Sequence, residues 1–157
     1  MTGGIANHFE TQITGVYCGV ASMANILNAI NLPREERPAF SSINEYPYFS
    51  QGNLFNPCMR DIMHEAGIYR PPMGITLRQL SAYFKCRVPS DYITADRIVG
   101  GAKGLSTLLK RHLSIKGHYL VANFHRASIG QTGDGHHSPI AAYAPEHDMV
   151  LIMDVAK

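Results

Sequence analysis

The order of local patterns along the chain constrains its fold more than any other feature of the sequence. Residues 17–30 carry apolar side chains at helical spacing, namely Val20, Met23, Ala24, Leu27 and Ile30. The last third of the chain instead holds two short apolar runs of β-forming residues, 119–124 and 149–153, which we expect to be buried strands. Helices first and sheet second predict an α+β fold.

The other local signals are weaker. Helices are expected at residues 60–66, 76–84 and 95–113, the last interrupted by glycines between 100 and 104. Residues 33–58 contain four prolines among polar and aromatic side chains, which predicts a long irregular segment.

Length and composition exclude several classes of protein. With 157 residues, 45% apolar and 17% charged, the chain can bury a core and is not expected to be disordered. No apolar run reaches the roughly 18 residues of a membrane-spanning helix, and residues 1–10 lack the features of an export signal. The expected location is therefore the cytoplasm, with no membrane partner. A net charge of +2 without a basic run interleaved with aromatics argues against nucleic acid.

The three cysteines, Cys18, Cys58 and Cys86, include no CxxC pair. An odd number predicts at least one free thiol, and the spacings suggest neither a disulfide framework nor a thiolate zinc site. We therefore expect Cys58 and Cys86 to be packing residues.

Cys18 stands at the predicted start of the helix over residues 17–30. Unpaired backbone N–H groups and the helix dipole favour a thiolate there, which suits a nucleophile. The alternative is that Cys18 is a small buried apolar side chain, as most free cysteines are.

Hairpin geometry brings a histidine and an acid together. A strand at 137–143, joined by a turn at 144–148 to the last apolar run, forms an antiparallel hairpin in which paired residue numbers sum to about 290 to 293. His136 and Asp154 satisfy that sum, so the carboxylate can orient one ring nitrogen toward a nucleophile. The alternative is that His136 and His137 are solvated turn residues and Asp154 is an ordinary C-terminal charge.

Gln12 is a candidate for stabilising an oxyanion. It lies six residues before Cys18, and its amide N–H can act together with the backbone N–H of Cys18. The alternative is an exposed loop glutamine without a role.

Six short segments carry a resemblance to a known family. They are 9–12 (FETQ), 17–22 (YCGVAS), 48–55 (YFSQGNLF), 74–80 (GITLRQL), 135–139 (GHHSP) and 151–156 (LIMDVA). In this order and spacing they resemble the catalytic domain of the phytochelatin synthases and their bacterial relatives, a branch of the papain-like cysteine peptidases. The resemblance implies a papain-like fold and one catalytic domain over residues 1–157.

The resemblance also implies site residues. It places the family's catalytic cysteine, histidine and aspartate on Cys18, His136 and Asp154, and its oxyanion glutamine on Gln12. His137 stands where relatives commonly carry an apolar residue, so it is expected to be a neighbour only.

Substrate contacts are implied at Gly135 and Lys157. Relatives usually have an arginine at the position of Lys157, and a lysine cannot reproduce a bidentate contact to the γ-glutamyl carboxylate. Relatives also continue past Lys157 into a further helix and strand. The chain is then either a shortened member that closes its sheet differently, for example through a homodimer, or a piece of a longer protein.

The implied reaction is attack of Cys18 on the Cys–Gly bond of glutathione, which gives a γ-glutamylcysteinyl thioester and free glycine. Water as acceptor gives γ-glutamylcysteine, as small bacterial relatives do more often, and a second glutathione gives phytochelatin. Acylation requires no cofactor, whereas cadmium or zinc enters as a metal–glutathione substrate or activator in metal detoxification.

Two other functions stay open. One is a papain-like peptidase or deamidase with another peptide substrate. The other is a non-catalytic metal-binding module whose spacings match no known zinc pattern. Its candidate ligands are Cys58, Cys86, His64, His125 and His147.

Overall fold

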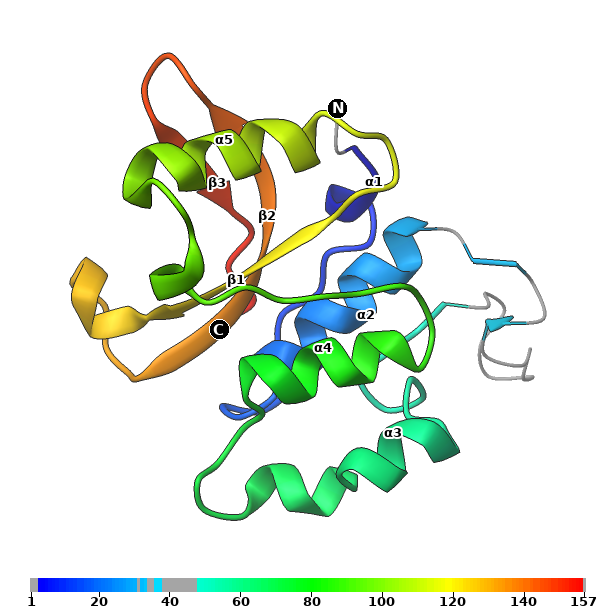
Figure 1. Cartoon of the computed structure of the whole chain (residues 1–157). Coiled ribbons are helices and arrows are strands. Elements are labelled where there is room, and N and C mark those ends of the chain that lie inside the picture. Colours follow the sequence, from blue (N-terminus) through cyan, green and yellow to red (C-terminus); the bar gives the residue numbers. More distant parts are fainter. Residues whose placement is uncertain (1–2, 31, 34–35, 38–47, 157) are drawn as a thin grey trace.

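Helix α2 (Cys18–Ile30) lies at the centre of the computed structural model, where it contacts other helices and strand β2 (Gly135–Ala144) of the sheet (Figure 1). The structure describes residues 3–30, 32–33, 36–37 and 48–156. Every residue of α2 from Cys18 to Leu27 is buried, because α2 packs against α1 (Gly3–Ala6), the sheet and α4 (Leu77–Lys85). The helix predicted over residues 17–30 is confirmed.

The sheet has the strand order β1-β2-β3, and both pairings are antiparallel. Its strands are β1 (Leu120–His125), β2 (Gly135–Ala144) and β3 (Met149–Ile152). Ala144 pairs with Met149 and Ile140 with Ile152, with a bulge between Ile140 and Ala142. The predicted α+β class and the C-terminal hairpin are confirmed.

Both apolar runs form strands, as expected, but the expectation that these strands are buried is wrong. Side chains of β1 are half-buried or exposed, and in β3 Met149 and Leu151 are 64% and 59% exposed. Strand β3 lies at the edge of the sheet and pairs only with β2. An apolar run therefore does not by itself say whether a neighbouring element covers it.

The weaker helix predictions have mixed outcomes. The helix expected at 60–66 is wrong in its bounds, because Asn56 caps α3 (Pro57–Ile62) and the chain leaves helical geometry at Met63. A short 3₁₀ helix, Glu65–Tyr69, follows. Residues 34–35 and 38–47 of the predicted irregular segment lie outside the described residues.

The helices predicted over residues 76–84 and 95–113 agree more closely with the structure. Helix α4 begins after Thr76, whose side chain forms a capping box with Gln79, so the prediction over 76–84 is confirmed. The segment at 95–113 divides into a 3₁₀ helix, Ala95–Arg97, and α5 (Gly101–Leu113), which packs against β2 (Figure 1). The break falls at Gly100, whose φ of +88° favours glycine.

A disulfide between Cys58 and Cys86 corrects the reading of the cysteines. It links the first turn of α3 to the C-cap of α4, and those two helices pack together. The expectation of no disulfide is wrong, because only the packing of α3 on α4 brings these distant residues together. The expectation of a free thiol is confirmed at Cys18.

Reduction of this disulfide is expected to lower the free energy of unfolding by about 3 kcal/mol, because the bond closes a loop between residues 28 apart. Urea unfolding with and without reductant measures the change. A Cys58→Ser/Cys86→Ser variant is the control, since its midpoint should not respond to reductant. An unchanged midpoint for the parent protein would contradict the prediction.

None of the helices in the described part of the chain is both long and apolar enough to cross a membrane. The apolar interior instead gathers around α2, with side chains from α3, α4 and the residues between them. A second, smaller cluster consists of Cys18, Ala21 and Val155, with Phe9 packed against it. This small cluster joins the start of α2 to the end of the chain that follows β3.

Candidate active site

Cys18 is the first residue of α2, and its thiol is free and buried. Burial raises the pKa of this thiol, while hydrogen bonds from the backbone N–H groups of His137, Gly19 and Cys18 itself, and the charge of Arg126, lower it by less. The N–H groups at the start of α2 therefore lower the pKa of the thiol, as expected from the sequence, but burial raises it by more. Cys18 packs in one small cluster with Val155, the residue that follows Asp154, and Ser22 of the same helix donates to the His137 carbonyl.

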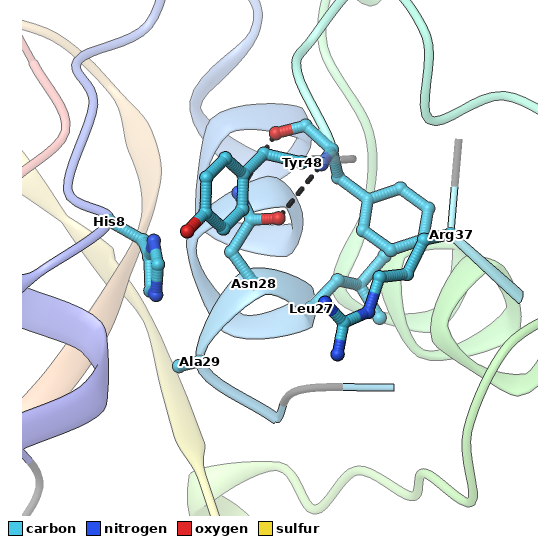
Figure 2. Close-up of a pocket in the computed structure, with 7 residues that line it drawn as sticks. His8, Leu27, Asn28, Ala29, Arg37 and Tyr48 are labelled. Atoms are coloured by element: carbon cyan, nitrogen blue, oxygen red, sulfur yellow. Dashed lines mark hydrogen bonds between the residues drawn. The ribbon is translucent and has the colours of Figure 1, made fainter. Parts of the chain in front are cut away.

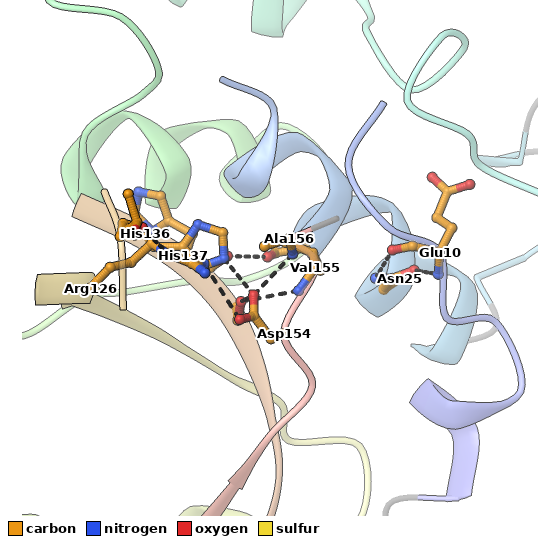
Figure 3. A network of polar contacts seen from close by, with 11 residues as sticks. Glu10, Asn25, Arg126, His136, His137, Asp154, Val155 and Ala156 are labelled. Atoms are coloured by element: carbon orange, nitrogen blue, oxygen red, sulfur yellow. Dashed lines mark hydrogen bonds and ion pairs between the residues drawn. The ribbon is translucent and has the colours of Figure 1, made fainter. Parts of the chain in front are cut away.

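His136 and Asp154 meet, as the hairpin geometry predicted. His136 Nε2 lies 2.7 Å from Asp154 Oδ1, and the His136 side chain is only 6% exposed (Figure 3). The Phe124 ring contacts the imidazole edge-on, with 5.6 Å between ring centroids. Because Nε2 faces the carboxylate, Nδ1 is the ring nitrogen that can face a nucleophile.

Several donors hold the Asp154 carboxylate. The Ala156 N–H donates to Oδ1 at 2.9 Å, the Ser138 hydroxyl to Oδ1 at 3.4 Å, and Arg126 Nη1 to Oδ2 at 3.4 Å. Burial alone would raise the pKa of this carboxyl, but the Ala156 N–H, His136 and the charge of Arg126 together lower it. The carboxylate is therefore ionised at neutral pH.

The chain beyond β3 is tied down although it no longer forms a strand. The Met153 N–H donates to the Pro139 carbonyl at 2.9 Å, and the Val155 N–H donates to the Ser138 hydroxyl at 3.3 Å. The Gln12 N–H donates to the Val155 carbonyl at 2.7 Å. These bonds hold Asp154 in place beyond the end of β3.

Gln12 is buried, at 8% exposed, so the alternative of an exposed loop glutamine is wrong. Its Oε1 atom accepts no hydrogen bond from the described residues. A half-turn about the last side-chain bond exchanges the carbonyl oxygen for the N–H₂ group, so the same position can present a donor. An amide with one unpartnered end is suited to bind a substrate oxygen.

His137 has a different environment from His136. Its Nε2 lies 3.0 Å from the Ile75 carbonyl, and Ser22 donates to its backbone carbonyl. Asn123 Nδ2 lies 3.1 Å from Nδ1 and 3.0 Å from Nε2. Because the Ile75 carbonyl can only accept, Nε2 carries the ring proton, and Nδ1 is the ring nitrogen that accepts from Asn123. Burial lowers the pKa of His137, so the ring is neutral and joins β2 to the residues before α4.

The neutral His137 predicts a pH dependence of stability. Below about pH 6.5 the unfolded chain takes up a proton at His137, whereas the folded chain does not. The free energy of unfolding should therefore decrease as the pH decreases, by up to about 1.4 kcal/mol per pH unit. Urea unfolding between about pH 7 and pH 5 measures the slope. A His137→Gln variant, which keeps a donor for Ile75, should show a shallower slope. Identical slopes would contradict the prediction.

The remaining predicted site residues are less informative. Gly135 is the first residue of β2 and is exposed beside His136. Lys157 lies outside the described residues. For the metal-binding alternative, the disulfide occupies both candidate cysteines, and across the described ranges no three His, Cys, Asp or Glu side chains gather as metal ligands.

Figure 2 shows a pocket at the opposite end of α2 from Cys18. Its volume is about 140 Å³, and its lining includes His8, Leu27, Asn28 and Tyr48. Leu27 lies nine residues along the helix from Cys18, a rise of about 14 Å. This pocket is therefore separate from the cluster of Cys18, His136 and Asp154.

Three residues that no sequence pattern singled out support Asp154 and His137. Arg126 and Ser138 hold Asp154, and Asn123 holds His137. Asn123 is paired with His137 across β1 and β2, so the strand register offers a signal for it. Arg126 follows β1 in a 3₁₀ helix, Arg126–Ile129, where no pattern in the sequence indicates its direction.

Comparisons with known proteins point to one family. A family profile described as phytochelatin synthase matches residues 3–157. Glutathione gamma-glutamylcysteinyltransferase 1 of Triticum aestivum is 30% identical over 156 residues, covering 98% of this chain and 28% of that protein. Glutathione gamma-glutamylcysteinyltransferase 3 of Lotus japonicus is 26% identical over 156 residues, covering 98% and 29%. The chain thus spans less than a third of the length of these two relatives.

Proposed function

The chain belongs to the phytochelatin synthase family, and from this we propose that it cleaves the Cys–Gly peptide bond of glutathione through a thioester on Cys18. The observation that carries the proposal is the 2.7 Å contact between His136 and Asp154, whose neighbour Val155 packs with the free Cys18 at the start of α2. Histidine oriented by a carboxylate and placed near a thiol is the arrangement that cysteine acyl transfer requires.

In the first step, Cys18 attacks the carbonyl carbon of the Cys–Gly bond. Because burial keeps the thiol protonated in the free site, His136 Nδ1 takes the proton as attack proceeds. His136 then gives that proton to the leaving nitrogen, so that the C–N bond breaks and glycine departs as an amine. The γ-glutamylcysteinyl group remains on the sulfur as a thioester.

We assign two groups to stabilise the charge that develops on the carbonyl oxygen. They are the backbone N–H of Cys18, at the positive end of α2, and the side-chain amide of Gln12. Asp154 fixes the tautomer of His136 and stabilises the imidazolium that forms between the two proton transfers.

In the second step His136 deprotonates an acceptor, which attacks the thioester carbonyl; the C–S bond breaks, and the Cys18 sulfur leaves and takes the proton back from His136. Water gives γ-glutamylcysteine, and the amine of a second glutathione gives phytochelatin. Cadmium or zinc belongs in this scheme as part of a metal–glutathione thiolate substrate, while the acylation step uses this chain's own residues.

The same arrangement supports our proposal that the fold is papain-like. The proposed nucleophile begins the central helix, the histidine comes from strand β2 of an antiparallel sheet packed against that helix, and the acid comes from the segment just beyond β3 (Figure 1). We also propose that residues 1–157 form the catalytic domain of this family. A cytoplasmic location stays a prediction, and a disulfide is more typical of an oxidising compartment.

Product analysis with and without cadmium tests the proposed function. The protein is incubated with glutathione, and the products are separated and identified by mass. We expect free glycine in stoichiometric amounts with either γ-glutamylcysteine or phytochelatin chains. Conversion of other peptides, with glutathione left intact, would instead select the peptidase or deamidase alternative.

A further inference from the structure

A buried glutamine outside the proposed catalytic set holds the loop that carries Gln12. Gln51 is 3% exposed, and its Nε2 donates to the Thr11 carbonyl at 2.9 Å and to Glu10 Oε1 at 3.0 Å. Its Oε1 accepts from the Ile13 N–H at 3.0 Å. Gln51 therefore binds the backbone immediately before and immediately after Gln12.

Asn25 holds the same loop from the other side. It lies on α2 and is fully buried. Its Oδ1 accepts from the Glu10 N–H at 2.9 Å, and its Nδ2 donates to the Glu10 carbonyl at 3.1 Å (Figure 3). Two bonds to one residue fix both the position and the orientation of the backbone. Because Asn25 is on the helix that begins with Cys18, the loop is held relative to the nucleophile.

The position of Gln51 is itself fixed by α2. Asn28 exchanges a pair of hydrogen bonds with the backbone of Phe49, both at 2.8 Å (Figure 2). The turn that follows is closed by Asn53, which accepts from the Ser50 N–H at 2.7 Å. Gln51 is thus presented to the loop from a segment that is attached to the same helix.

We infer that Gln51 and Asn25 are positioning residues for the reaction at Cys18, a role that rests on the proposed function. The Gln12 side chain needs such support because its Oε1 has no partner in the described part of the chain, so the backbone must place it. A shift of about 1 Å in a group that stabilises a transition state can cost about 100-fold in rate. We call Gln51 and Asn25 together the clamp. The Gln12 N–H also donates to the Val155 carbonyl, next to Asp154, so the clamp supports the acid as well.

The first test replaces Gln51 by methionine, which keeps the length of the side chain and removes its hydrogen bonds. We expect kcat for glycine release to fall by roughly 10- to 100-fold, while KM changes by less than about threefold, because orientation in the transition state is lost rather than binding. The matched control is Asn56→Ala, which removes amide-to-backbone bonds at Met59 and Cys86 and leaves the loop untouched. Its kcat should stay within about twofold of the parent.

A double variant separates positioning from a general structural role. If Gln51 acts through Gln12, then Gln51→Met should cause almost no further loss of kcat in a Gln12→Ala background. The fall in thermal stability should be the same in both backgrounds. An equal loss of kcat with and without Gln12 would overturn the inference.

A conservative variant keeps the test usable if Gln51→Met does not fold. In Gln51→Glu the new carboxylate still accepts from Ile13, but it faces the Glu10 carboxylate and donates to Thr11 only when protonated. Its kcat relative to the parent should therefore rise as the pH falls from about 8 to about 6. A ratio that stays constant over this range would count against the clamp.

Hydrogen exchange distinguishes failure of the clamp from failure of the proposed function. The N–H groups of Gln12 and Ile13 should exchange at least about tenfold faster in Gln51→Met than in the parent, whatever the substrate. Unchanged exchange overturns the clamp alone. If exchange is faster in Gln51→Met than in the parent, and the parent nevertheless releases no glycine from glutathione, the proposed function alone is overturned.

Discussion

Glycine release from glutathione is expected to fall by at least about 10⁴-fold when Cys18 is replaced by alanine. The variant lacks the atom that forms the thioester, and oxyanion stabilisation and substrate binding alone leave only a small residual rate. Single-turnover release of glycine, compared between parent and variant at equal protein concentration, measures the effect.

The other two cysteines provide the matched control. A Cys58→Ser/Cys86→Ser variant should be less stable but should keep the rate of glycine release within a few-fold, because the disulfide lies between α3 and α4 and outside the cluster around Cys18. Release that persists in folded Cys18→Ala would show that another group is the nucleophile.

Replacing Asp154 by asparagine should lower kcat by about 10² to 10⁴-fold while leaving the fold intact. The carboxylate accepts from His136 Nε2, so its loss removes both the fixed tautomer and the stabilisation of the imidazolium. Steady-state kinetics with glutathione, together with the unfolding midpoint of each protein, measure the change.

Ser138→Ala is the control for this prediction. The Ser138 hydroxyl donates to the same carboxylate at 3.4 Å and accepts from the Val155 N–H, so it supports Asp154 without touching His136. We expect a loss of kcat of less than about tenfold for this variant. An Asp154→Asn protein as active as Ser138→Ala would contradict the proposed role of the carboxylate.

The meeting of His136 and Asp154 was predictable from the sequence because register in an antiparallel hairpin follows from the position of its turn. The observed pairs Ala144–Met149 and Tyr143–Val150 have the register that the turn predicts. The helix that begins at Cys18 was also predictable, because its apolar spacing is regular and it ends before a proline.

Other features depend on packing that local patterns do not contain. The Cys58–Cys86 bond requires α3 and α4 to lie side by side, and the exposure of β3 depends on its place at the edge of the sheet. The pKa of Cys18 is a balance between burial and nearby N–H groups, and only the folded chain determines which is larger.

Local patterns do not predict the role of Gln51 either, because it is 39 residues from Gln12 in the sequence. Gln51 reaches the residues on either side of Gln12 from a segment that Asn28 holds against α2 through Phe49. The resemblance drew attention to residues 48–55 without indicating what they do. Homodimer formation, the use of a metal–glutathione substrate and the role of Lys157 stay predictions.

Intact-mass spectrometry of acid-quenched protein detects the proposed thioester itself. After rapid mixing with glutathione, we expect an adduct on Cys18 with the mass of glutathione less glycine, formed as free glycine appears and absent from Cys18→Ala. A mixed disulfide with glutathione would retain the glycine and is therefore distinguishable by mass. Glycine release without this adduct, or with the adduct on another residue, would rule out a thioester on Cys18 as the intermediate.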